Sequence, residues 1–156
     1  MARPSANERF SAAASRLGIE PDIVQFPEDT RTAAQAAAAL KCELGQIIKS
    51  LVFQCEEQPV LALTAGDRQV DTDLLGGLCG GTIGKADAKL VRDATGFAIG
   101  GVPPFGHAAQ LSCWVDQNIY RYEIAWGAAG TPDTVFAIET ADLRRLSGGQ
   151  VAEFTN

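Results

Sequence analysis

The chain has 156 residues, of which 46% are hydrophobic and 21% charged, so we expect one domain over residues 1–156 with a buried core of its own. Its formal net charge of −6 argues against stable non-specific binding to nucleic acid, because phosphate contacts dominate that affinity. The N-terminal residues lack the apolar core of a signal peptide, and no apolar run approaches the length of a membrane span. The composition therefore predicts a cytoplasmic protein with no membrane partner.

Capping residues and apolar spacing predict the helices, and runs of β-branched and apolar residues predict the strands. Helices are expected from Ser5 to Gly18, from Asp29 or Thr30 to about Lys41, from Asp71 or Thr72 to Gly80, from Asp87 to Gly96, and from Thr140 to Gly148. Strands are expected at residues 23–26, 46–55, 60–65, 82–85, 111–115, 122–126 and 134–138, with an edge strand at 151–154. Short strands that mix irregularly with helices indicate an α/β protein with a mixed sheet.

The strand at residues 46–55 contains a lysine in an apolar setting. Period-two alternation puts Lys49 on the same face as Ile47 and Leu51, and both faces are largely apolar, so we expect a central strand covered on both sides. An ammonium group among apolar neighbours is costly to bury without a partner, so we interpret Lys49 as a functional residue. The alternative is a lysine whose stem packs while its amine reaches water.

Residues 99–107 combine three glycines, two prolines and the only histidine of the chain. Glycine permits positive φ, and Pro103 with Pro104 stiffens the middle of the loop. Such a rigid loop can present backbone N–H groups to a developing oxyanion. The amides expected to be available are those of Gly100, Gly101, Phe105 and Gly106. The alternative is an ordinary tight turn.

The cysteines give little support for metal or redox chemistry. Cys42, Cys55, Cys79 and Cys113 are widely spaced, and with one imidazole no zinc site, no other metal site and no cofactor are expected. In a reducing compartment they behave as small core residues. Two alternatives stay open, a nucleophilic cysteine paired with His107 and a small-molecule ester or thioester hydrolase that uses Cys79 or Cys113.

The strand Ile47–Phe53 with its lysine, followed by the loop Gly100–Gly106, resembles the YbaK/ProX family of aminoacyl-tRNA deacylases. That family carries a strand lysine and a Gly-x-x-x-Pro loop, which Gly100 to Pro104 matches. The resemblance covers about residues 20–150 and extends to Gly66-Asp67, Val70-Asp71, Gly84-Lys85 and Asp142-Leu143. It implies a compact, β-barrel-like mixed sheet surrounded by helices.

The same resemblance implies a free-standing trans-editing hydrolase that deacylates mischarged tRNA, with tRNA for proline as the expected substrate. Lys49 would position phosphate or ribose oxygens, and Gly100, Gly101 and Pro104 would complete the catalytic loop. The residues expected to bind substrate are Ser50, Val102, Phe105, Gly106 and His107. The expected partners are a transiently bound aminoacyl-tRNA and, as a candidate, prolyl-tRNA synthetase; no DNA partner is expected.

The resemblance does not determine which amino acid would be removed from tRNA, because the residues at three positions do not match one known branch of the family. Pro103 stands where the cysteine-specific branch of the family usually has Ser, and Ser50 stands where the alanine-specific branch usually has Asn. His107 after the loop resembles a distinct branch. We therefore expect a small amino acid such as alanine, serine, threonine, cysteine or a close analogue.

Contact with tRNA requires a local basic patch in this acidic chain. Lys85, Lys89 and Arg92 are spaced four and three residues apart, so they share a face if the segment is helical. The alternative is a solvated helix face. A competing function is a non-catalytic module that uses the same pocket to recruit a synthetase or to bind a nucleotide, although the retained Lys49 and the Gly-x-x-x-Pro loop argue against it.

Overall fold

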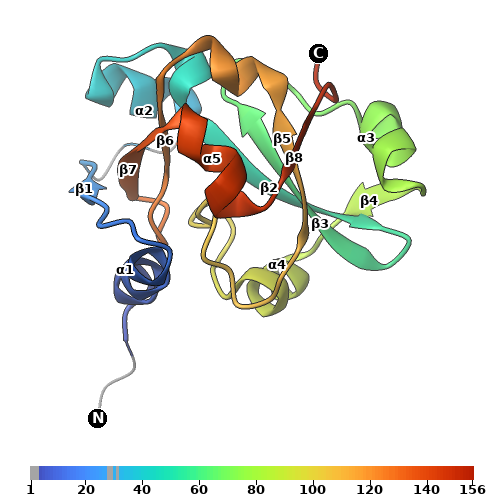
Figure 1. Ribbon diagram of the computed structural model, residues 1–156, viewed down its shortest axis with the longest axis horizontal. Helices are drawn as coiled ribbons and strands as arrows, with labels where there is room; N and C mark the ends of the chain where they lie inside the picture. Colours follow the sequence, from blue (N-terminus) through green and yellow to red (C-terminus); the bar gives the residue numbers. More distant parts are fainter. Residues whose placement is uncertain (1–3, 28–29, 31) are drawn as a thin grey trace.

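A computed structural model of the chain describes residues 4–27, 30 and 32–156, and it has the mixed α/β architecture that the sequence predicts (Figure 1). The α-helices are α1 (Ala6–Arg16), α2 (Ala33–Leu40), α3 (Thr72–Cys79), α4 (Ala88–Thr95) and α5 (Thr140–Ser147). The strands are β1 (Val24–Gln25), β2 (Ile48–Cys55), β3 (Gln58–Ala65), β4 (Ile83–Lys85), β5 (Ser112–Asp116), β6 (Ile124–Ala128), β7 (Thr134–Glu139) and β8 (Gln150–Ala152). Two 3₁₀ helices, η1 (Leu44–Gln46) and η2 (Gln117–Arg121), precede β2 and β6.

The strands form two sheets. The five-stranded sheet has the order β4-β2-β3-β5-β8, with antiparallel pairs around β2 and parallel pairs around β5. The three-stranded sheet has the order β1-β7-β6 and is antiparallel. A single parallel bridge between Ile47 and Trp126 joins β2 to β6. Because this is the one bridge between the two sheets among the described residues, the barrel-like arrangement of the strands does not form a closed barrel.

Several expected boundaries shift in the structure. Helix α2 begins after Thr32, whose hydroxyl accepts a hydrogen bond from the Gln35 amide at 3.1 Å, and not after Thr30; the alternative cap Asp29 lies outside the described residues. The hairpin between β2 and β3 turns on Glu56 and Glu57, both with positive φ, so Pro59 belongs to β3. A two-residue turn of this conformation matches the twist of the flanking strands.

The C-terminal elements also differ in extent. The strand expected at 122–126 is β6 at 124–128, since η2 occupies the preceding residues. The last strand is β8 at 150–152, and it lies at the sheet edge as expected. None of the described helices is long and apolar enough to cross a membrane.

The main hydrophobic core is shared by the two sheets and fixes the loop at residues 99–107. Its centre is a trio of aromatic rings, Phe10 of α1, Phe105 of the loop and Phe136 of β7, whose centroids lie 4.7–5.6 Å apart. Phe105 is fully buried, so the loop is anchored between α1 and the three-stranded sheet. Aromatic pairs in this range contribute beyond their buried area.

The opposite face of the five-stranded sheet is covered by α3 and by the C-terminal residues, through a smaller cluster around Leu75 and Phe154. Strand β2 packs on both faces, through Val52 on one side and Phe53 on the other, but β3 and not β2 is the central strand of the sheet, contrary to expectation. Strand β2 is paired along only part of its outer edge, because β4 pairs with residues 53–55 alone. Residues 48–52 of β2 consequently present an edge that β4 does not cover.

Candidate active site

A pocket of about 470 Å³ lies along the outer edge of β2 that β4 leaves uncovered. Its walls come from β2, from α2, from the ends of β6 and β7, and from the loop segment 99–102. The lining is largely apolar, with two lysines, Lys49 and Lys85, and with the hydroxyl-bearing Ser50. A concave, mainly apolar cavity with a few polar groups is typical of a small-molecule or substrate site.

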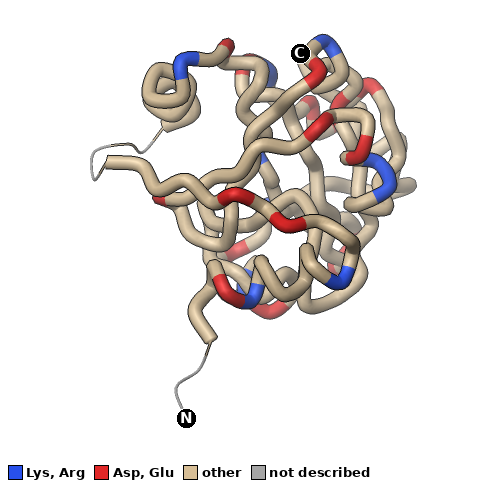
Figure 2. Tube along the Cα trace, turned by 60° about the vertical axis from the view of Figure 1, so that its left-hand side comes forward, with Lys and Arg blue, Asp and Glu red and all other residues tan. Residues whose placement is uncertain are grey.

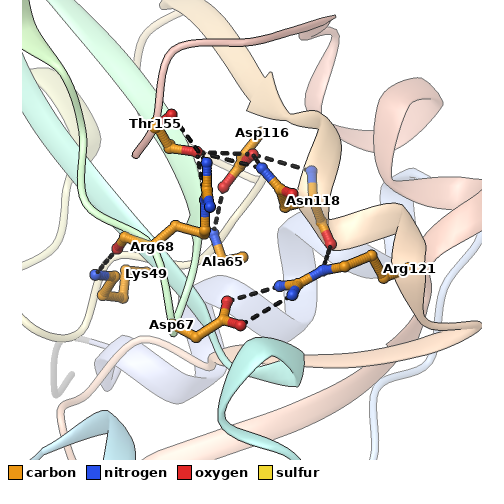
Figure 3. Close-up of polar contacts among 8 residues, drawn as sticks. All are labelled: Lys49, Ala65, Asp67, Arg68, Asp116, Asn118, Arg121 and Thr155. Atoms are coloured by element: carbon orange, nitrogen blue, oxygen red, sulfur yellow. Dashed lines mark hydrogen bonds and ion pairs between the residues drawn. The ribbon is translucent and has the colours of Figure 1, made fainter.

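Lys49 is partly buried and has a defined partner. Its Nζ donates a hydrogen bond to the backbone carbonyl oxygen of Arg68 at 2.6 Å (Figure 3). Burial lowers the pKa of the Lys49 ammonium, and the nearby carboxylates of Asp116 and Asp67 partly oppose this change. The ammonium group is thus satisfied by a carbonyl and by nearby negative charge, which reduces the cost of holding it beside an apolar pocket.

Ser50 follows Lys49 on β2, and strand alternation directs its side chain to the opposite face of the sheet. Its hydroxyl oxygen is buried and has no hydrogen-bond partner among the described residues. Ser50 also lines the pocket. A buried hydroxyl without a partner loses the hydrogen bonds that water would give it, so a polar ligand group that reaches Ser50 would recover them.

The glycine residues of the loop have different roles. Gly100 lines the pocket with a φ of 87°, a conformation that favours glycine. The Gly101 amide donates to the Ala98 carbonyl at 2.9 Å, so it is not available to a ligand as was expected. A Cβ at Gly101 would lie 2.7 Å from the Gly130 carbonyl oxygen, which means that the loop packs backbone against backbone there. The amides of Gly100 and Val102 have no partner among the described residues.

The second half of the loop is held inside the protein. Pro104 packs on β6, where a Cβ at Gly127 would lie 2.9 Å from its ring. His107 donates a hydrogen bond from Nε2 to the Pro103 carbonyl at 2.6 Å, and burial lowers the pKa of its imidazole. Gly101, Pro104, Phe105, Gly106 and His107 are not among the residues that line the pocket. In this structure they shape the loop, while Gly100 and Val102 face the cavity.

The three expected basic contacts do not share one helix. Lys85 belongs to β4 and lines the pocket, whereas Lys89 and Arg92 lie on α4 outside it. Lys89 is exposed and pairs with Asp93 at 2.6 Å. Figure 2 shows lysine and arginine interspersed with acidic residues along the trace. Lys85 is thus the cation of this group that lies at the pocket.

Neither cysteine alternative gains support. Cys113 is buried, burial raises the pKa of its thiol to about 12, and it does not line the pocket. Burial likewise raises the pKa of Cys79. A thiol with a raised pKa is a poor nucleophile at neutral pH, because the thiolate is the reactive form. Within the described parts of the chain, no cluster of three or more His, Cys, Asp or Glu side chains could hold a metal ion.

Sequence reasoning missed the polar network behind Lys49 (Figure 3). Asp116 directly follows the strand expected at 111–115, and in the structure it ends β5 as a fully buried carboxylate that accepts a hydrogen bond from the Ala65 amide at 3.1 Å. Arg68 and Thr155 carried no signal in the sequence, since their link spans 87 positions. An acidic residue directly after an apolar strand was the one local sign of this network.

Residues 27–146 match the family model of the aminoacyl-tRNA editing domain. The match spans most of the chain, so this protein belongs to the aminoacyl-tRNA editing domain family, which confirms the resemblance seen in the sequence. It is an aminoacyl-tRNA deacylase, an enzyme that hydrolyses the ester of mischarged tRNA.

Individual relatives agree with this assignment. The uncharacterized protein YwhH of Bacillus subtilis is 29% identical over 133 residues, which is 85% of each chain. The multifunctional Ser/Thr-tRNA deacylase ProXp-y of Escherichia coli K12 is 32% identical over 118 residues, covering 71% of this chain and 70% of that protein. A crystal structure of a candidate trans-editing enzyme for prolyl tRNA synthetase matches with a TM-score of 0.93 at 38% identity, covering 100% of this chain and 99% of that one.

Proposed function

We propose that this deacylase acts in trans on tRNA for proline that carries serine or threonine. The observation that carries the proposal is the single pocket that brings together Lys49, the unpartnered hydroxyl of Ser50 and the loop at Gly100. The similarity to a Ser/Thr-tRNA deacylase and to a candidate trans-editing enzyme for prolyl tRNA synthetase supports the substrate class.

The side-chain hydroxyl of the amino acid is the feature that we expect Ser50 to recognise. A hydroxyl group placed beside Ser50 would satisfy its buried oxygen, whereas alanine would leave it unpaired. Sites built around a polar contact reject an analogue that lacks the polar group more strongly than apolar pockets reject one methyl group. Serine and threonine are therefore favoured over alanine.

The chemical step is the addition of water to the ester carbonyl, followed by loss of the tRNA ribose oxygen as the leaving group. The amides of Gly100 and Val102 would stabilise the oxyanion, because fixed backbone donors stabilise charge that develops in the transition state. Lys49 would hold a phosphate or ribose oxygen of the tRNA end, and its charge would align the ester with the loop. A ribose hydroxyl of the substrate would take part in water activation.

Lys85, at the outer part of the pocket, would contact the phosphates of the acceptor end, with Lys89 and Arg92 giving weaker contacts further out. We propose prolyl-tRNA synthetase as the functional partner, the cytoplasm as the site of action, and residues 1–156 as one domain.

The test is a single-turnover deacylation screen with tRNA for proline charged with serine, threonine, alanine, cysteine or proline. The expected order is serine and threonine first, alanine and cysteine about tenfold slower, and proline slowest. Faster hydrolysis of the alanine ester would overturn the role given to Ser50. If the enzyme hydrolysed none of these esters, the choice of tRNA for proline would be overturned.

A further inference from the structure

The Lys49 ammonium is oriented by the turn that follows β3. Within the described residues, the Lys49 side chain donates one hydrogen bond, to the Arg68 carbonyl 19 residues away, at 2.6 Å (Figure 3). An ammonium group has three N–H donors, so this bond leaves two for a ligand. Their direction depends on where the Arg68 carbonyl lies. The groups that fix this carbonyl therefore control how Lys49 meets a substrate.

The C-terminal residues hold the Arg68 turn from one side. Arg68 donates from Nε to the Thr155 hydroxyl at 3.1 Å and from Nη2 to the Thr155 carbonyl at 3.0 Å. Backbone amides of Gln69 and Asn156 each donate to the other residue's carbonyl, at 3.0 and 2.9 Å. Val70 and Thr155 form an antiparallel bridge. The last residues of the chain thus pair with this turn as a short strand would.

Thr155 connects the turn to a buried charge. Its hydroxyl, in a residue that is 3% exposed, donates to Asp116 Oδ1 at 3.3 Å and also accepts from Asn118 Nδ2 at 3.3 Å. With the Arg68 Nε bond, the one proton and two lone pairs of this hydroxyl are all used. Asp116 is further held by the Asn118 amide at 2.9 Å. The Thr155 hydroxyl therefore connects the Arg68 side chain to Asp116 at the end of β5.

A second link holds the same turn from its other side. Asp67 accepts two hydrogen bonds from the Arg121 guanidinium, at 2.6 and 2.9 Å, and Arg121 Nε donates to the Asn118 carbonyl at 2.7 Å. Both links therefore end at Asn118 in η2. Bidentate pairs of this kind fix geometry as well as adding energy.

We propose that Thr155 is a positioning residue for Lys49, acting through Arg68 to aim the ammonium group into the pocket. The proposal rests on the function proposed for Lys49, but the orientation of the ammonium can be measured without tRNA. Thr155 is not among the residues that line the pocket; it sets the position of the carbonyl that holds Lys49.

The matched variants are Thr155→Val, which keeps the branched shape and removes the hydroxyl, and Thr155→Ser, which keeps the hydroxyl. We expect Thr155→Val to lower kcat about tenfold with KM changed less than about twofold, because an interaction made in the transition state is misaligned. The kcat of Thr155→Ser, which keeps the hydroxyl, should stay within about threefold of the wild-type value. If kcat fell as much in Thr155→Ser as in Thr155→Val, the proposal would be contradicted.

The second readout is hydrogen exchange of the Lys49 ammonium, followed by nitrogen-15 NMR, with the exposed Lys41 as internal reference. Exchange at Lys49 should accelerate about fivefold or more in Thr155→Val and stay unchanged in Thr155→Ser, because a held ammonium exchanges more slowly. Arg68→Leu breaks the same link from its other end and should give the same acceleration. Unchanged exchange at Lys49 in both folded variants would overturn the proposal, even if the wild type deacylated none of the tested tRNAs.

Discussion

Two neighbouring residues of β2 have separate chemical environments because strand alternation sends them to opposite faces of the sheet. Lys49 turns toward the Arg68 carbonyl and the carboxylates of Asp67 and Asp116. Ser50 turns toward the main core, where its hydroxyl has no partner within the described residues. One strand thereby supplies both a cation and a hydroxyl to the same pocket.

Replacing Ser50 by alanine should change selectivity more than stability. We expect the preference for serine over alanine, measured as the ratio of kcat/KM on the two charged tRNAs, to fall about tenfold. The melting temperature should stay level or rise slightly, because an unpartnered buried hydroxyl is removed. Ser112→Ala, on β5 away from this pocket, is the control. A selectivity ratio equal to that of the wild type would exclude Ser50 from recognition.

At the level of elements, the loop at 99–107 shows what local sequence predicts and what it does not. Its residues Ile99, Gly100 and Val102 line the same pocket as Lys49. Its composition does not predict which amides remain available, because the Gly101 amide is taken by the Ala98 carbonyl of a local turn. Nor does it predict the close packing of Gly101 on Gly130 and of Pro104 on β6, which are far away in the sequence. The burial of Phe105 likewise depends on α1 and β7.

Gly101→Ala should destabilise the protein and not only slow the reaction. A Cβ there would meet the Gly130 carbonyl oxygen at 2.7 Å and the Thr131 Cα at 2.8 Å, and backbone cannot move aside as a flexible side chain can. We expect a loss of about 1–3 kcal/mol in the free energy of unfolding, the usual cost of overpacking, measured by urea denaturation. Gly84→Ala, where nothing lies within 4 Å of the added Cβ, should be close to neutral. Equal stability of the two variants would contradict the packing described for the loop.

The loop should also make stability depend on pH through His107. Burial lowers the pKa of this imidazole below its ordinary value of 6.5, so the unfolded chain binds a proton that the folded chain disfavours. The contribution of neutral His107 is complete above pH 6.5 and is lost as pH falls through the lowered pKa. The free energy of unfolding of the wild type should therefore be lower at pH 5.5 than at pH 7.5. His107→Gln should show a flatter profile over this range; identical slopes would mean that His107 does not titrate in this way.

The helices and the β2–β3 hairpin were predictable because their signals are local. Ser5, Asp71 and Asp87 each cap a helix as expected, and the apolar runs of β2 and β3 lie on either side of a tight turn. The division into two sheets was not predictable, since it depends on a long-range contact: β6 pairs with the segment before β2 through one bridge, between Ile47 and Trp126. The partners of Lys49 were missed for the same reason, because they come from two distant segments, Asp67 with Arg68 and Asp116.

For the whole molecule, the net charge of −6 implies that contact with tRNA depends on few cations. Lys85→Glu should raise KM about tenfold at low salt and reduce the salt dependence of kcat/KM, with kcat little changed, because Lys85 lies at the pocket. Lys89→Glu should have a smaller effect, because Lys89 is already paired with Asp93 outside the pocket. KM measured over a series of salt concentrations tests this order. A larger rise in KM for Lys89→Glu than for Lys85→Glu would indicate that tRNA contacts α4 instead.

The central claim is that the pocket beside β2 is the deacylation site and that it depends on the Lys49 charge. The most direct test is single-turnover hydrolysis of seryl-tRNA for proline by Lys49→Ala, with Lys41→Ala as an exposed control and thermal melting measured in parallel. We expect Lys49→Ala to melt as the wild type does and to lose about a hundredfold or more in rate, since a fixed charge at the reacting group contributes on this scale. A folded Lys49→Ala protein that retains the wild-type rate would contradict the account.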